Sequence, residues 1–120
     1  MPSDRPSKRP DDKPGIEQRK APRKAVLLTS KIVYGEGAHV FDCTIRDISV
    51  SGARITLSKG RDIPANVFLL DMVNRIAYDA VVVSQRAGGY GLQFKNTHPL
   101  AQINAPELRY LKRIWIEYAR

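Results

Sequence analysis

A cluster of cations in a short proline-containing segment is the first feature of the sequence that could do chemistry. Residues 19–24 read Arg-Lys-Ala-Pro-Arg-Lys and hold four basic side chains. A guanidinium group presents a planar fork of N–H donors, which fits phosphate oxygens or the O6 and N7 edge of guanine. Arg19, Lys20 and Arg23 are therefore candidate anion ligands. A solvated basic linker is the alternative, because charge runs are common on protein surfaces.

A second candidate is the polar segment Asp-Ile-Ser-Val-Ser-Gly at residues 47–52, which lies between two strand-like stretches. The carboxylate of Asp47 could accept hydrogen bonds from the N–H groups of a base, and the hydroxyl of Ser49 could bond a phosphate or a base edge. Gly52 permits a positive φ or a close backbone approach. An ordinary turn is the alternative, since Asp, Ser and Gly are typical turn residues.

The overall charge favours an anionic partner. The chain has 120 residues, with 20 Lys and Arg against 12 Asp and Glu, a net charge of +8 and a pI near 9.9. This balance is typical of proteins that bind a nucleotide, a nucleic acid or a lipid head group. Residues 1–24 carry eight basic and four acidic side chains, so a fifth of the chain supplies half of the excess charge.

Several function classes are disfavoured by what the sequence contains. Cys43 is the only cysteine, which excludes an intramolecular disulfide, and His39 and His98 add too few ligands for a structural metal site. There is no Walker-type phosphate loop and no nucleophile, base and acid at motif spacing. We therefore expect a protein that is not an enzyme and that carries neither a metal nor a cofactor.

The polar residues must be positioned by one domain. Residues 1–18 contain four prolines and little apolar mass, which predicts a disordered, basic, Pro-rich tail. The domain is expected over residues 19–120. The apolar runs are too short to span a bilayer and the N-terminus lacks an apolar signal core, so we expect a cytoplasmic protein without membrane insertion.

Alternating apolar and polar residues predict a sheet. Cys43 and Ile45 face one way while Thr44 and Arg46 face the other, and similar runs recur about every ten residues. Strands are predicted over residues 26–34, 41–46, 53–57, 67–71, 75–83 and 90–94. Short strands at this spacing favour a six-stranded antiparallel β-barrel.

The end of the chain changes to a helical period. Leu108, Leu111 and Trp115 recur at three- and four-residue steps, and Asn104 with Pro106 supplies a predicted N-cap and a first-turn proline. The fold class is therefore all-β with one C-terminal amphipathic helix. The apolar stripe of the helix is expected to be a lid on the barrel, with a dimerisation face as the alternative.

The two polar segments together resemble the PilZ domain family. The resemblance rests on Arg-x-x-x-Arg at Arg19 and Arg23, followed by Asp-x-Ser-x-x-Gly at Asp47, Ser49 and Gly52. It extends over residues 19–118, through the Gly-Leu-Gln-Phe sequence of the last strand to the helix. Members of this family are six-stranded barrels that bind cyclic di-GMP, a bacterial second messenger with two guanines and two phosphates.

The resemblance implies a role for each motif residue. Arg19 and Arg23 would grip phosphate and the Hoogsteen edge of guanine, and Asp47 would accept from guanine N–H groups. Ser49 and Gly52 would line the floor of the pocket. Such a protein would be a cyclic di-GMP receptor or adaptor that reports to a partner protein of motility, adhesion, biofilm or exopolysaccharide machinery, through ordering of the Arg-x-x-x-Arg loop.

Three further residues are secondary candidates for the same ligand. Lys20 adds charge to the loop, and Arg54 lies on the polar face of its strand, where it is either solvated or near the ligand. Arg86 occupies the region where some family members place an aromatic residue, and a stacking guanidinium is conceivable there. Gln18 precedes the first arginine, a position that in the family influences whether one ligand or an intercalated pair binds.

Two alternatives to the receptor remain open on the sequence. One is a basic β-barrel that binds single-stranded nucleic acid on aromatic platforms. Most aromatic residues fall on positions needed for the core, which leaves few for base stacking. The other is a PilZ-like protein-interaction module without a ligand, and the intact arginines and Asp47 count against it.

Overall fold

The computed structural model describes residues 23–57, 62–86 and 88–119 of the chain. The predicted tail over residues 1–18, and the candidates Arg19 and Lys20, lie outside the described residues. The described elements, in chain order, are β2 (Lys24–Tyr34), β3 (His39–Ile48), β4 (Gly52–Leu57), β5 (Asn66–Asp71), β6 (Ile76–Arg86), β7 (Gly89–Pro99), the 3₁₀ turns η1 (Leu100–Gln102) and η2 (Pro106–Leu108), and helix α1 (Arg109–Tyr118).

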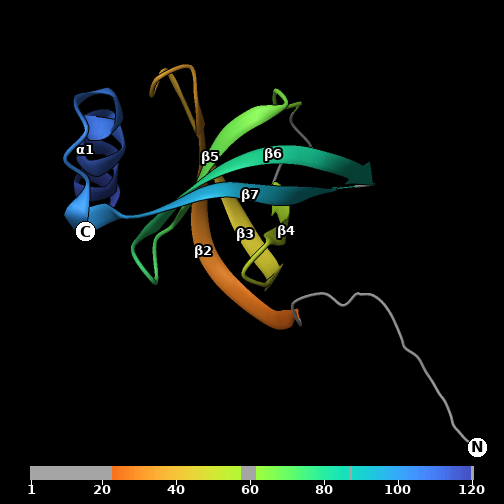
Figure 1. Cartoon of the computed structure of the whole chain (residues 1–120). Coiled ribbons are helices and arrows are strands. Elements are labelled where there is room, and N and C mark those ends of the chain that lie inside the picture. The colour runs from red at the N-terminus through yellow and green to blue at the C-terminus, as the bar shows by residue number, and fades with distance from the viewer. Residues whose placement is uncertain (1–22, 58–61, 87, 120) are drawn as a thin grey trace, which may run out of the picture.

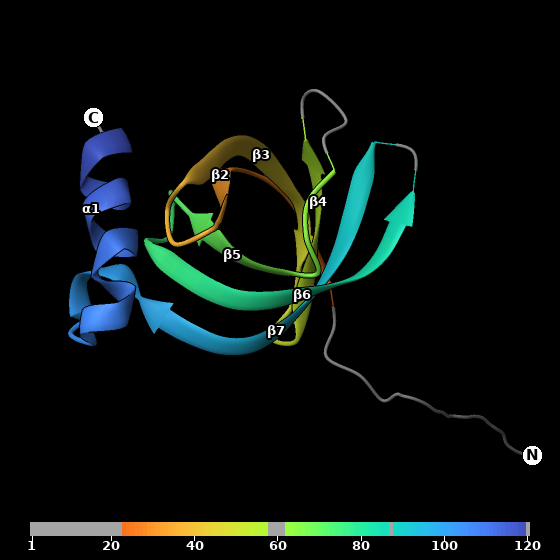
Figure 2. The same cartoon turned by 90° about the horizontal axis from the view of Figure 1, so that it is seen from above.

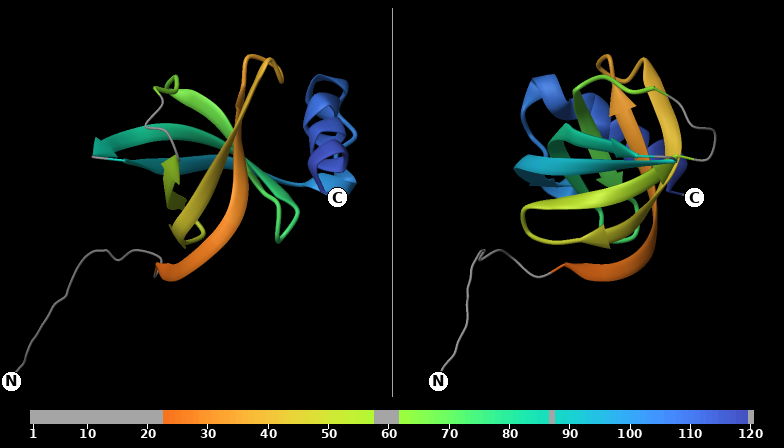
Figure 3. Two further views of the ribbon diagram at one scale, coloured as in Figure 1. Left: turned by 180° about the vertical axis from the view of Figure 1, so that it is seen from behind. Right: turned by 90° about the vertical axis from the view of Figure 1, so that its right-hand side faces the viewer.

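The strands form a closed, barrel-like ring in the order β2-β3-β4-β7-β6-β5 (Figure 1, Figure 3). Every neighbouring pair is antiparallel, including the β2–β5 pair that closes the ring. The prediction of six antiparallel strands followed by a C-terminal helix is therefore confirmed. The closing pair runs from Ser30–Asp71 to Val33–Phe68.

Several strands are longer than the sequence pattern predicts. β3 continues through Asp47 to Ile48, so Asp47 belongs to a strand and not to the loop expected from residue 47 onward. β6 and β7 reach Arg86 and Pro99, and their hairpin extends on the side of the ring opposite α1 (Figure 2). β6 begins one residue later than predicted, because Arg75 adopts a left-handed φ of 62° in the preceding turn.

The main core fills the interior of the ring. Ile32, Ile45, Ile55 and Leu69 are almost completely buried there, one from each of four neighbouring strands. Cys43 lies among them, and desolvation by burial raises the pKa of its thiol to about 12. The thiol thus stays protonated near neutral pH and serves as a small apolar core group.

A second apolar cluster lies outside the ring, beneath α1. Val33 of β2 and Leu70 of β5 point away from the interior, and Leu111 and Ile114 of the helix cover them. The helix therefore packs on the outer face of the ring as a lid (Figure 1, Figure 2), which confirms the first of the two predictions made for its apolar stripe.

The start of the helix differs from the prediction. Asn104 is not the N-cap. The chain enters through η2, whose N-cap is Ala105 and which has no side-chain capping hydrogen bond, and the α-helix begins at Arg109. Pro106 stands in the first turn, where its missing N–H costs nothing. Of the helices in the described part of the chain, none is long and apolar enough to cross a membrane.

Candidate ligand-binding site

A carboxylate held between two arginines is the centre of the candidate site. The Nη1 atom of Arg23 lies 2.6 Å from Oδ1 of Asp47, and the Nε atom of Arg54 lies 3.3 Å from Oδ2. The side chains of Arg23 and Arg54 are 50% and 59% exposed, whereas that of Asp47 is 22% exposed. Both guanidinium groups are therefore open to solvent and to an incoming anion, whereas the Asp47 carboxylate is more buried than either arginine side chain.

A β-bulge places Asp47 on the outer surface. Ile45 pairs with Ile55 and Asp47 pairs with Arg54, so Arg46 is an extra residue in β3. Strict alternation would send Asp47 to the interior with Ile45. The bulge shifts the phase by one residue, and the carboxylate comes to lie beside Arg54 on the outer face.

The turn between β3 and β4 is organised by Ser49. Its backbone N–H donates to the carbonyl oxygen of Gly52 at 2.8 Å, and its Oγ accepts from the backbone N–H of Ser51 at 3.2 Å. The two serine hydroxyls are 3.1 Å apart, and Val50 at the tip is 85% exposed. Ser49 thus shapes the turn next to Asp47 through its own side chain.

Gly52 is required by the neighbouring strand. A Cβ atom at this position would lie 2.2 Å from the carbonyl oxygen of Leu92 in β7. That contact is with backbone of a paired strand, which cannot move aside without breaking the ladder. The absence of a side chain at Gly52 therefore lets β4 and β7 pair directly beside the turn.

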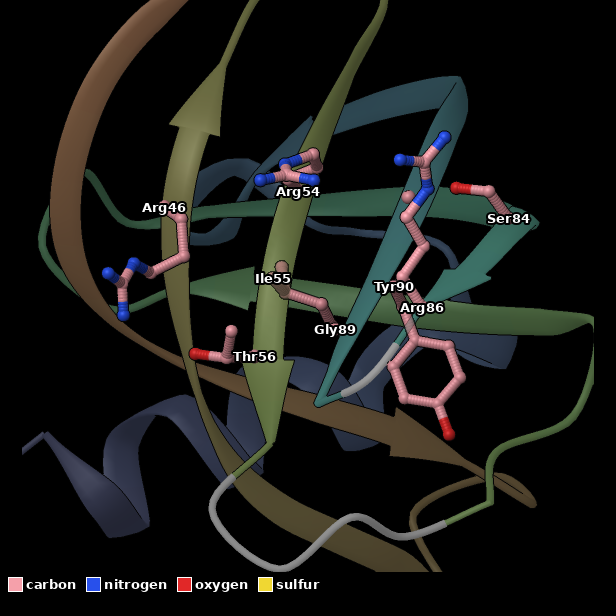
Figure 4. Close-up of a pocket in the computed structure, with 9 residues that line it drawn as sticks. Arg46, Arg54, Ile55, Thr56, Ser84, Arg86, Gly89 and Tyr90 are labelled. Atoms are coloured by element: carbon pink, nitrogen blue, oxygen red, sulfur yellow. The ribbon is translucent and has the colours of Figure 1, made fainter.

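A small pocket of about 100 Å³ lies on β3, β4, β6 and β7 and shares Arg54 with the Asp47 ion pairs (Figure 4). Three arginines surround it, Arg46, Arg54 and Arg86, with Arg54 between the other two in the close-up. Gly91 forms part of the floor, and a Cβ atom there would meet the Oγ of Ser84 at 2.3 Å. The pocket thus has three cations at its surface, and its other lining residues include Gly89, Gly91 and Tyr90.

The structure brings together most of the residues singled out in the sequence. Arg23, Asp47 and Arg54 are in direct contact, and Arg54 and Arg86 line the same pocket. Ser49 and Gly52 belong to the adjoining turn. The candidates Arg19, Lys20 and Gln18 fall outside the described residues.

Apart from Arg54 and Arg86, the residues that line this pocket were not singled out as candidates from the sequence. Arg46 was assigned only to the polar face of its strand, and Ser84 follows the end of the strand predicted over residues 75–83. Alternation alone already places Arg46 on the outer face, whereas the bulge at Val83 in β6 brings Ser84 to that face. The break in alternation after Val82 is the signal that could have identified Ser84.

No metal site is evident in this part of the chain. Across residues 23–57, 62–86 and 88–119 there is no group of three or more His, Cys, Asp or Glu side chains able to hold an ion. What the arrangement can do chemically is bind an anion with planar donors while offering a carboxylate acceptor next to them. A ligand with both phosphate oxygens and N–H donors matches that combination.

Comparisons with known proteins match this chain to a family and to a known fold. The model of the PilZ domain family matches residues 17–110. Among solved structures, the PilZ domain of CeSA from a cellulose-synthesizing bacterium aligns with a TM-score of 0.50 and 14% identity, covering 83% of this chain and 100% of that one. A search of curated protein sequences finds no significant match. At this level of identity the structural likeness concerns the fold.

Proposed function

The chain belongs to the PilZ domain family, and from this premise we propose that it is a receptor for cyclic di-GMP. The observation that carries the proposal is the Asp47 carboxylate held between Arg23 and Arg54 on the outer face of the ring. Cyclic di-GMP has two phosphates for the guanidinium groups and guanine N–H donors for the carboxylate. A simple anion would use only the cations.

We assign the roles as the family motifs suggest. Arg23, together with Arg19, would bind phosphate and the Hoogsteen edge of guanine. Asp47 would accept from guanine N–H groups, and Ser49 and Gly52 would border the base. Lys20, Arg54 and Arg86 would add contacts from the sides of the pocket, with the Arg86 guanidinium able to stack on a base.

The ion pairs of the free site do not prevent ligand binding. Exposed pairs such as Arg23–Asp47 contribute about 0–1 kcal/mol, because water screens both charges. A charge-assisted hydrogen bond to a phosphate is worth about 1.5–3 kcal/mol, so exchanging partners is favourable. A carboxylate also has further lone pairs, and Asp47 can accept from a base while one arginine stays in place.

We propose that the bound protein acts as an adaptor that reports to a partner protein. The expected partners belong to motility, adhesion or exopolysaccharide machinery, and the expected compartment is the cytoplasm. β2 supports such a role, because it starts at the site and ends beneath α1. Val33 packs under the helix, and the Nζ atom of Lys31 lies 4.5 Å from the ring centre of Tyr118.

Calorimetric titration with cyclic di-GMP tests the receptor proposal. We expect saturable binding of cyclic di-GMP and no comparable binding of GTP or a short RNA. We also expect a shallow dependence on salt, because only two phosphates are neutralised, whereas a polyanion releases many condensed counterions. Tight RNA binding with a steep salt dependence would establish the nucleic-acid alternative instead. An absence of any cyclic di-GMP binding would support a ligand-free interaction module.

Amide exchange with and without cyclic di-GMP tests the reporting step. We expect residues 17–24 to become protected on binding, because phosphate would neutralise the repulsion among neighbouring cations and fix them over the Ser49 turn. The strands of the ring should change little. Equal exchange of residues 17–24 in both states would rule out ordering of this loop as the signal, even if the ligand binds.

A further inference from the structure

The outward face of α1 has an isoleucine among cations. Ile116 is 56% exposed and lies in the last turn of a helix that buries Leu111 on its other side. Arg109, Lys112 and Arg113 precede it by seven, four and three residues, which places all of them on its face of the helix. This face is not part of the core or of the ligand-binding site.

A hollow of about 410 Å³ lies beside Ile116, between α1 and the segment that follows η1. Ile103 from that segment is 7% exposed and provides an apolar wall, and Asn104 next to it offers an exposed amide. The Nζ atom of Lys112 donates to the carbonyl oxygen of Ala101 at 3.3 Å, which ties the helix to this segment. We call this hollow the α1 groove.

The cations of the α1 groove have no acidic partner among the described residues. Within the described ranges, no ion pair involves Arg109, Lys112 or Arg113. Glu117 is on the same helix but is not within ion-pair distance of any of them. The groove therefore combines an apolar wall with an uncompensated positive rim, which attracts a negatively charged partner.

We propose that the α1 groove docks an acidic segment of a partner protein, which inserts a large apolar side chain between Ile116 and Ile103. An apolar centre with a charged rim is the usual anatomy of a protein interface. On this face of α1, Ile116 is the exposed aliphatic side chain among three cations. A single such side chain favours a peptide over a lipid surface, because an interfacial helix needs several apolar side chains that project into the membrane. Asn104 is placed to hydrogen-bond the backbone of the docked segment.

The α1 groove lies far from the proposed cyclic di-GMP site. In Figure 1 the helix is at one side of the ring, and the start of β2 and the β6–β7 hairpin are at the other. A partner on α1 would leave Arg23, Arg54 and Arg86 accessible. The inference goes beyond the receptor proposal and stands without it, since the groove and its charges do not depend on any nucleotide.

Fluorescence anisotropy with a labelled acidic peptide tests this proposal. The probe is a peptide of about twelve residues made of Glu and Leu, with the leucines spaced to form one face of a helix. We expect saturable binding to the full chain, weakened about tenfold or more by Ile116→Asp and by Arg113→Glu. Both positions are exposed, so neither variant should unfold the protein. Lys95→Glu, which makes the same charge reversal on the exposed part of β7, should bind as the parent does.

The other outcomes each contradict the proposal. No binding of the peptide, or equal binding by Ile116→Asp, would overturn it. Ile116-dependent binding to vesicles containing phosphatidylglycerol, without peptide binding, would assign the face to a membrane. A concentration-dependent dimer that Ile116→Asp abolishes would assign it to a second copy of the chain. Cyclic di-GMP titration of Arg113→Glu should be unchanged, so a failure here is distinct from a failure of the receptor proposal.

Discussion

Replacing Arg23 with alanine is expected to weaken cyclic di-GMP binding by about ten- to a hundredfold. The change removes one charge-assisted contact worth about 1.5–3 kcal/mol. The folded state should lose at most about 1 kcal/mol, because the pair that Arg23 forms with Asp47 is half exposed. Calorimetric titration measures the loss of affinity for cyclic di-GMP, and thermal unfolding of the same sample measures the loss of stability.

Matched variants show whether the loss is specific. Arg109→Ala removes an arginine of equal charge from the far side of the ring and should leave cyclic di-GMP binding unchanged. Asp47→Asn keeps the shape but exchanges an acceptor oxygen for a donor, so it should reduce guanine recognition while unrelated anions bind at least as well. If Arg23→Ala binds as tightly as the parent, Arg23 is not part of the ligand clamp.

The fold could be predicted because its signals are local. The alternation of apolar and polar residues predicted the burial of Cys43 and Ile45, and the three- and four-residue period of apolar residues predicted the C-terminal helix. Strand ends were harder, since pairing with a neighbour extends a strand past the point where its own pattern fades. β3 continues to Ile48 because Asp47 pairs with Arg54, a partner that the sequence of β3 alone does not reveal.

The candidate site was predicted in its residues but not in its geometry. The motif spacing pointed to Arg23 and Asp47, which are in contact across 24 positions of sequence. The place of Asp47 on the outer face of β3 was not predicted, because a bulge depends on the register between two strands, and register is a tertiary property. The α1 groove was missed for a related reason, since the hollow exists only once the segment at Ile103 lies beside the helix.

The structure also changes the interpretation of Gly52. The family resemblance implies that this glycine borders the ligand. In the structure, the atoms nearest to a Cβ added at Gly52 belong to the backbone of β7. An added Cβ would lie 2.2 Å from the carbonyl oxygen of Leu92 and 3.5 Å from Cα of Gln93, its pairing partner. The adjacent Ser51 accepts a backbone hydrogen bond from Phe94 at 2.8 Å, so a shift of β4 would disturb this bond as well.

Gly52→Ala is therefore expected to destabilise the fold by about 2–4 kcal/mol, from overpacking together with weakened hydrogen bonds between β4 and β7. The melting temperature should fall by about 10 °C or more for a domain of this size.

Gly88→Ala is the matched comparison. Gly88 has a φ of 75° and no atom within 4 Å of the added Cβ, so this variant should show only the cost of a left-handed residue, about 1–2 kcal/mol. Thermal unfolding of both variants measures the difference. If Gly52→Ala is as stable as the parent but no longer binds cyclic di-GMP, the ligand and not the β4–β7 ladder is the reason for this glycine.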